Sequence, residues 1–215
     1  GVIAGPMAIT AARTGGAAPI VKVLAEVRAA WGAGPDDPVV IHVGRIAPEK
    51  NYGLLFRAYD AMRAANPRLR FVLAGEGPLK AGLCRAQPRC RFEGFFSREE
   101  IGRRYASADL YIHASLTETF GNVLTEAMAS GLAVAGFDYA AAREFVRDGE
   151  NGLSVPVGQP DALVAAAVRL ATDAALRQRL RAAAPAALAA QTWEHVITRF
   201  ESDLAREIDG AHAAA

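Results

Sequence analysis

The stretch that decides the fold is residues 110–131, which read LYIHASLTETFGNVLTEAMASG. The apolar run from Leu110 to Ala114 predicts a buried strand, and the polar residues after it predict a turn. The pattern from Val123 to Ser130 predicts a helix, which Gly131 ends. A strand, a polar loop and a helix in this order are typical of the units that build a parallel sheet.

The same alternation of apolar runs and helical stretches continues along the chain, with strands expected near 39–43, 70–74, 90–93, 132–136 and 153–155. Helices are expected from Pro19 to Trp31 and from Gly53 to Ala65. The predicted fold class is therefore α/β, a doubly wound, Rossmann-like parallel sheet with a helical C-terminal tail. We expect a linker and first helix at 1–37, the Rossmann-like domain at 38–190, and a C-terminal helix and tail at 191–215.

Two carboxylates stand eight positions apart around the start of the helix, Glu118 in the loop and Glu126 on the helix itself. Asn122 and Glu126 share a helix face, so Glu126 can turn toward whatever occupies the loop. A bound phosphate would sit at the helix N-terminus, and a carboxylate beside it suits sugar or ribose hydroxyls better than phosphate. This segment therefore predicts a nucleotide site at the carboxyl edge of the sheet.

A second segment carries the opposite charge. The apolar run 39–43 is followed by Gly44 and Arg45, and then by Lys50. Gly44 lets the backbone come close to a ligand, and the two cations then lie at the mouth of the strand. The alternative is a solvated basic loop, and the presence of the acidic segment favours ligand contact over it.

These segments, taken in order, resemble the retaining glycosyltransferases of the two-domain GT-B architecture, of the group 1 or family 4 type. The donor domain of that class carries two glutamates in this spacing, and the resemblance runs from about Pro38 to about Leu204. It implies that Arg45 and Lys50 contact the diphosphate of a nucleotide sugar. It also implies that Glu118 holds the donor sugar's hydroxyls or its developing charge, and that Glu126 takes the ribose hydroxyls.

The resemblance implies further donor contacts, at Gly44, Gly75, Gly94, Phe95, Thr119, Phe120, Gly121, Asn122 and Val123. For the loops at Gly75 and at Gly94 and Phe95 the alternative is an ordinary turn, because Gly and Pro occur in the turns of any such fold. The implied substrate is a GDP-sugar or UDP-sugar, whose hexose moves to an acceptor hydroxyl of a lipid or glycan without a cofactor or an obligatory metal. Where many members have two glycines before a glutamate, this chain has Ala140 and Ala141 before Glu144. Together with 117–123, this segment resembles the bacterial glycolipid mannosyl- and glucosyltransferases.

Members of the family usually carry an acceptor-binding domain ahead of such a segment, and we expect that domain to be the missing partner of this chain. Transfer needs an acceptor held against the donor sugar, so the isolated chain should bind donor but transfer poorly. For the full enzyme we expect a cytoplasmic location, with peripheral association at the inner face of the plasma membrane as a further expectation.

Composition excludes several classes of protein. A chain of 215 residues with 52% hydrophobic content can bury a sizeable core. Its net charge of +1 gives no sign of the basic surface that nucleic-acid binding requires. Cys84 and Cys90 fit neither a metal spacing nor a disulfide framework, and no apolar run approaches the roughly 20 residues that span a bilayer.

Other polar residues have a structural interpretation. Arg177, Arg179 and Arg181 are predicted to form a solvated helix face, and His42 and His113 to be hydrogen-bonded structural histidines. Two further functions stay open: a non-catalytic nucleotide-binding module, and a nicotinamide-dependent oxidoreductase. The second is disfavoured because no Gly-x-Gly-x-x-Gly follows the first strand.

Overall fold

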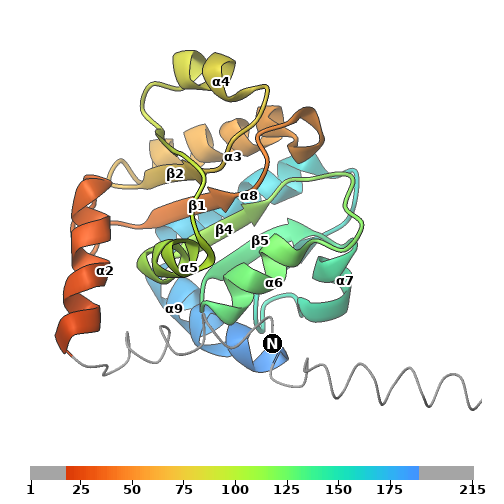
Figure 1. The fold of residues 1–215 in the computed structure, drawn as a ribbon. Coiled ribbons are helices and arrows are strands. Elements are labelled where there is room, and N and C mark those ends of the chain that lie inside the picture. Colours follow the sequence, from red (N-terminus) through yellow and green to blue (C-terminus); the bar gives the residue numbers. More distant parts are fainter. Residues whose placement is uncertain (1–17, 189–215) are drawn as a thin grey trace, which may run out of the picture.

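In the computed structural model, residues 18–188 are described. They form an α/β domain around a six-stranded parallel sheet with strand order β3-β2-β1-β4-β5-β6 (Figure 1). This confirms the predicted doubly wound fold. The predictions for the first seventeen residues and for the C-terminal helix and tail at 191–215 lie outside the described residues.

The six strands lie where apolar runs predicted them, each within one residue of the expected bounds. They are β1 (Val39–Val43), β2 (Arg70–Ala74), β3 (Arg91–Glu93), β4 (Leu110–His113), β5 (Ala133–Phe137) and β6 (Leu153–Val155). The two central strands are buried along almost their whole length. Because helices cover a parallel sheet on both faces, such strands read as continuous apolar runs rather than alternating ones.

Helices cover both faces of this sheet. They are α2 (Ala18–Ala30), α3 (Tyr52–Ala65), α4 (Lys80–Ala86), α5 (Arg98–Ser107), α6 (Asn122–Ala129), α7 (Ala141–Phe145), α8 (Pro160–Thr172) and α9 (Ala174–Ala183), with 3-10 turns η1 (Pro48–Lys50) and η2 (Ala184–Leu188). Figure 1 shows α5 and α6 in front of the sheet and α3 and α8 behind it. One core cluster packs with α3 and α8, through Leu55 and Leu163, and a second with α5 and α6, through Tyr105 and Leu124.

Local signals explain where several helices begin. Ser97 caps α5, because its hydroxyl accepts from the Glu100 N–H while the Glu100 carboxylate accepts from the Ser97 N–H. The start of α6 has no side-chain cap; Gly121 precedes it with a φ of 97°. Such a φ is available to glycine without strain, so the loop after β4 can turn abruptly into α6.

A buried charge network ties the amino ends of the strands together. Asp109, just before β4, accepts hydrogen bonds from Arg28 Nη1 and from the Val39 N–H, both at 3.0 Å, and from Arg181 Nη1. Arg28 thereby connects α2, which packs against α5, to the sheet. Arg177 is half-buried and donates to the Leu170 carbonyl. The predicted solvated face was therefore wrong for Arg177 and Arg181, because α9 turns these residues toward the domain.

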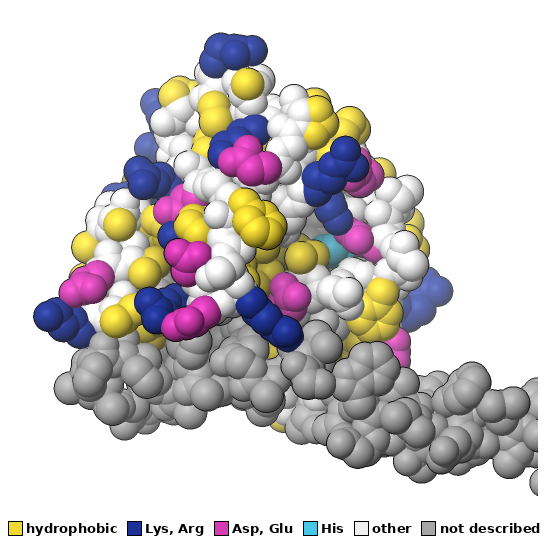
Figure 2. Space-filling model, viewed as in Figure 1, with side chains coloured by type: hydrophobic (Ala, Val, Ile, Leu, Met, Phe, Trp, Pro, Cys, Tyr) yellow, Lys and Arg dark blue, Asp and Glu magenta, His cyan; other side chains and the backbone are white. Residues whose placement is uncertain are grey.

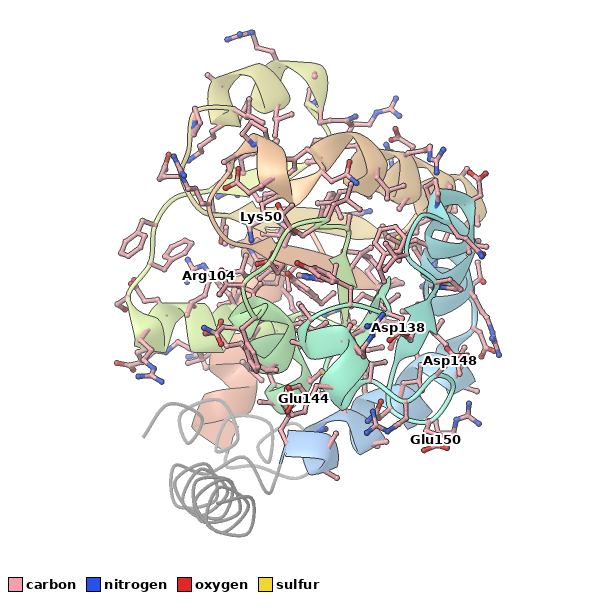
Figure 3. The ribbon with its side chains drawn as sticks, turned by 90° about the vertical axis from the view of Figure 1, so that its right-hand side faces the viewer. Lys50, Arg104, Asp138, Glu144, Asp148 and Glu150 are labelled. Atoms are coloured by element: carbon pink, nitrogen blue, oxygen red, sulfur yellow. The ribbon has the colours of Figure 1, made fainter. Side chains whose placement is uncertain are left out.

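The site is placed by the strand order. Connections run outward in opposite directions from β1 and β4, so the loops after these two strands diverge and leave a crevice at the carboxyl edge of the sheet. This is the switch point of the fold. Figure 3 views this edge, with Lys50 over the strand ends and Arg104 and Asp138 to either side. Among residues 18–188, no helix is long and apolar enough to cross a membrane.

Candidate functional site

The two predicted charged segments meet at the switch point between β1 and β4. Lys50, at the end of η1, places its Nζ 2.6 Å from Oε1 of Glu118 in the loop after β4. Their side chains are only 15% and 11% exposed. Figure 2 shows a hollow in the surface with a histidine side chain at its floor and basic and acidic side chains beside it. The cation and the carboxylate that sequence reasoning assigned to diphosphate and sugar therefore form one largely buried ion pair between the loops after β1 and β4.

Two more hydrogen bonds hold the same loops together. Asn51 Nδ2 donates to the Ala114 carbonyl at 3.2 Å, and Ser115 Oγ donates to the Glu49 carbonyl at 3.0 Å. Both bonds join the loop after β1 to the loop after β4. The crevice is thus built on two loops that are fixed relative to each other, which preorganises the Lys50 and Glu118 side chains.

Neighbouring groups keep Glu118 ionised. Burial on its own would raise the pKa of Glu118, but the hydrogen bond from Lys50 and the positive charge of Lys50 act against it, and the pKa of Glu118 lies below the usual value. His113 Nε2 lies 3.9 Å from Glu118 Oε1. Burial lowers the pKa of His113 to about 4, although the Glu118 carboxylate acts in the opposite direction. Near neutral pH Glu118 is therefore ionised and the His113 imidazole is neutral.

Glu126 behaves differently from Glu118. It lies one turn into α6, half-buried, and Oε2 accepts a hydrogen bond from the Tyr105 hydroxyl at 3.2 Å. Burial raises the pKa of Glu126, and the hydrogen bond from Tyr105 offsets this only in part. Tyr105 fixes the direction of the carboxylate, and sequence reasoning had no signal for this contact between residues 21 positions apart.

The glycines of the edge are needed for close approach of the loops. Gly44 follows β1 with a φ of 144°, and a Cβ on Gly75 would lie 1.9 Å from the Gly44 carbonyl oxygen. A Cβ on Gly77 would likewise lie 2.2 Å from the Ile46 carbonyl oxygen. These contacts give Gly75 a packing role between the loops after β1 and β2. Its predicted contact with donor stays a prediction, as do those of Gly44 and Gly94.

Several predicted contacts are open to solvent at this edge. Arg45 is exposed and forms no ion pair with any residue in the part of the chain that the structure describes. Phe95, after β3, is 86% exposed. Its neighbour Phe96 is held under the Arg104 guanidinium, 3.3 Å from the ring centroid, and Arg104 Nε donates to Glu93 at 2.8 Å. These contacts hold the loop after β3 in place at Phe96, while the phenyl ring of Phe95 beside it is exposed.

The remaining predicted contacts surround the start of α6. Thr119 and Asn122 are exposed, Val123 is partly buried, and Phe120 is 41% exposed with its ring edge-on to Phe145. A shallow pocket of about 380 Å³ is lined by Asn51, Leu116, Gly158 and Pro160, among others. Neither Lys50 nor Glu118 lines this pocket, so it lies beside the crevice and not in it.

Sequence reasoning missed the residue that holds the Glu118 backbone. The Tyr139 hydroxyl lies 2.7 Å from both the N–H and the carbonyl oxygen of Glu118. The next residue, Ala140, has φ 48° and ψ −131°. The alanine thus keeps a backbone conformation suited to glycine, at a cost of about 1–3 kcal/mol. The only sequence signal was the absence of the glycines that many family members have here.

His42 departs from its predicted role. The structure buries it completely in β1, where its ring lies edge-on to Tyr52 and parallel to Tyr111. Neither ring nitrogen has a hydrogen-bond partner among residues 18–188, so the prediction of a hydrogen-bonded histidine was wrong here. Burial, with added repulsion from His113 and Lys50, lowers the pKa of His42 to about 3. For His113 the prediction is confirmed, since Nδ1 lies 3.4 Å from the Tyr111 hydroxyl.

Comparison with known proteins agrees with this geometry. The family described as glycosyl transferases group 1 matches residues 25–187. A GDP-mannose-dependent alpha-mannosyltransferase of Mycobacterium tuberculosis is 37% identical over 143 residues, which are 64% of this chain and 36% of the relative. The protein with the same description from Mycolicibacterium smegmatis is 34% identical over 186 residues, 84% of this chain and 47% of the relative. The chain thus spans less than half the length of these relatives.

The fold has solved counterparts too. HepE from Anabaena, solved in complex with UDP-glucose, superimposes with a TM-score of 0.69 at 25% identity, covering 86% of this chain and 53% of that one. The family match extends from α2 to η2 and so includes the entire described sheet and both loops of the crevice. This chain therefore belongs to the group 1 glycosyltransferases, as the resemblance of its sequence predicted.

Proposed function

We propose that this chain is the donor-binding domain of a retaining glycosyltransferase that moves a hexose from a nucleoside-diphosphate sugar to an acceptor hydroxyl. The observation that carries the proposal is the pairing of Lys50 with Glu118 at 2.6 Å across the switch point. A cation there can bind a diphosphate, and a carboxylate beside it can hold the hydroxyls of the attached sugar.

The chemistry assigned to these residues is charge stabilisation. As the bond between the hexose and the diphosphate breaks, negative charge grows on the departing phosphate oxygens. Lys50 and Arg45 would neutralise it, and the N-terminus of α6 would add its dipole. The sugar nucleotide itself is the substrate, and we expect neither a further cofactor nor a metal. We assign no general base, since no group in the crevice requires that role.

The relatives favour a guanine nucleotide. The two mycobacterial relatives are described as dependent on GDP-mannose, and they are 37% and 34% identical to this chain. HepE, at 25% identity, was solved with UDP-glucose. We therefore propose GDP-mannose as the first donor to test and UDP-glucose as the second. The acceptor, a lipid or glycan hydroxyl, would be bound in the part of the full protein that lies outside this chain.

The role of Lys50 can be tested by substitution. Lys50→Ala should weaken GDP binding by about tenfold to a hundredfold, because a hydrogen bond to a charged group contributes roughly 1.5–3 kcal/mol. Guanosine, which has no phosphate, should bind both proteins equally, as calorimetry of the two ligands would show.

The matched control for this substitution is Lys22→Ala. Lys22 is exposed on α2, where it pairs with Glu26 at 4.0 Å, so its loss should leave both affinities unchanged. If Lys50→Ala left GDP affinity unchanged, Lys50 would not be a diphosphate ligand. Equal losses for GDP and guanosine would instead indicate general damage to the site.

A further inference from the structure

Two hydrogen bonds, at Ala114 and Ser115, hold only the start of the loop that carries Glu118. Between β4 and α6, Leu116, Thr117, Thr119 and Phe120 are exposed. The Glu118 carboxylate is fixed by Lys50, but that contact holds only the tip of a flexible side chain. A bound donor would compete for the same lysine. The position of the Glu118 backbone must therefore be set by something other than Lys50.

The Tyr139 hydroxyl supplies that anchor. It accepts a hydrogen bond from the Glu118 N–H and donates one to the Glu118 carbonyl, each at 2.7 Å. One side-chain group thus satisfies both backbone polar groups of a single residue. The ring itself is half-buried and packs against the core cluster of α3 and α8. The hydroxyl is thereby a fixed point, and it fixes the Cα from which the carboxylate extends.

The residues that follow Tyr139 also hold the loop that carries Glu118. Two residues later, the Ala141 N–H donates to the Phe120 carbonyl at 2.8 Å, so the segment 139–141 holds the Glu118 loop at two places. Between these tethers, Ala140 adopts a φ of 48°, which L residues rarely do. A strained backbone persists where its surroundings over-determine it, and here it turns the chain so that both tethers reach one loop.

We propose that Tyr139 is a positioning residue: by fixing the Glu118 backbone, its hydroxyl gives the crevice its preference for a nucleoside-diphosphate sugar over the nucleoside diphosphate alone. This inference rests on the proposed function of the crevice. The diphosphate is held by Lys50 and by the loop after β1, whereas the sugar depends on the carboxylate that Tyr139 positions. Loss of the hydroxyl should accordingly weaken the binding of the sugar nucleotide more than that of the nucleoside diphosphate.

The test measures the affinities of GDP and GDP-mannose for the 215-residue chain by calorimetry. Tyr139→Phe keeps the ring and removes the hydroxyl. We expect Tyr139→Phe to lower the affinity for GDP-mannose by about fivefold to tenfold and to leave the affinity for GDP within about twofold. A loss of this size corresponds to one hydrogen-bonded anchor. Tyr59→Phe is the matched control, because the Tyr59 hydroxyl shares a hydrogen bond with Cys90 in the buried core. It should leave both affinities unchanged.

A double-mutant cycle shows whether Tyr139 acts through Glu118. Glu118→Gln should by itself reduce the preference for GDP-mannose, and adding Tyr139→Phe to it should then cause no further loss, because both changes remove the same interaction. Additive losses, or an unchanged preference in Tyr139→Phe, would overturn the inference while leaving donor binding intact. Failure of the unsubstituted chain to bind either ligand, or UDP and UDP-glucose in their place, would overturn the proposed function together with the inference.

Discussion

Replacing Asp109 by Ala is expected to lower the free energy of unfolding by about 3–5 kcal/mol, because it breaks a buried network of charges. The Asp109 side chain is 9% exposed and pairs with Arg28 and Arg181, which are 10% and 18% exposed. Removing the carboxylate leaves two buried cations facing one another and an unsatisfied N–H at Val39. Urea unfolding monitored by circular dichroism would measure the loss.

Glu99→Ala is the control for Asp109→Ala. Glu99 pairs with Arg103 on the surface of α5, and the two side chains are 73% and 45% exposed. Such a pair contributes about 0.2–1 kcal/mol, because water screens both charges. If Asp109→Ala destabilised the chain no more than Glu99→Ala, the buried charge network would not be what holds α2 and α9 to the amino ends of the strands.

Acidification should unfold the protein through its two buried histidines. In the unfolded chain a histidine titrates near 6.5, whereas burial lowers the folded pKa of His42 to about 3 and that of His113 to about 4. As pH falls below 6.5, the unfolded state binds protons that the folded state does not bind, so the free energy of unfolding decreases. The expected loss is about 2 kcal/mol per histidine between pH 7 and pH 5.

His42→Phe isolates one of the two contributions. The phenyl ring can keep the packing against Tyr52 and Tyr111 but cannot take up a proton. The loss of stability between pH 7 and pH 5, measured by urea unfolding at each pH, should fall by about half in His42→Phe. It should nearly vanish when His113→Phe is added. An unchanged loss in both variants would show that other groups cause the acid sensitivity.

Much of the fold was predictable because its signals are local. The apolar run at 39–43, bounded by Pro38 and Gly44, is typical of a strand covered on both faces, and Gly121 and Gly131 mark the limits of α6. Parallel strands bring their carboxyl-end loops to one edge, so the sequence also predicted that Lys50 and Glu118 lie at the same edge. The structure adds that these two residues pair directly.

What the sequence could not predict depends on contacts between distant positions. Asp109 finds Arg28 and Arg181 at separations of 81 and 72 positions. The charge pattern of α9 does not say which of its arginines turns inward. Tyr139 contacts Glu118 at a separation of 21 positions, through its side-chain hydroxyl. No periodicity in the sequence encodes such contacts.

We propose that the crevice between β1 and β4 binds a nucleoside-diphosphate sugar. The most direct test is to titrate the purified chain by calorimetry with GDP, UDP, ADP and NAD, followed by the sugar conjugates of whichever nucleotide binds. We expect saturable binding of GDP, or of UDP in its place, tighter binding of the matching sugar nucleotide, and no binding of NAD. Binding of NAD alone, or of none of the four, would contradict it.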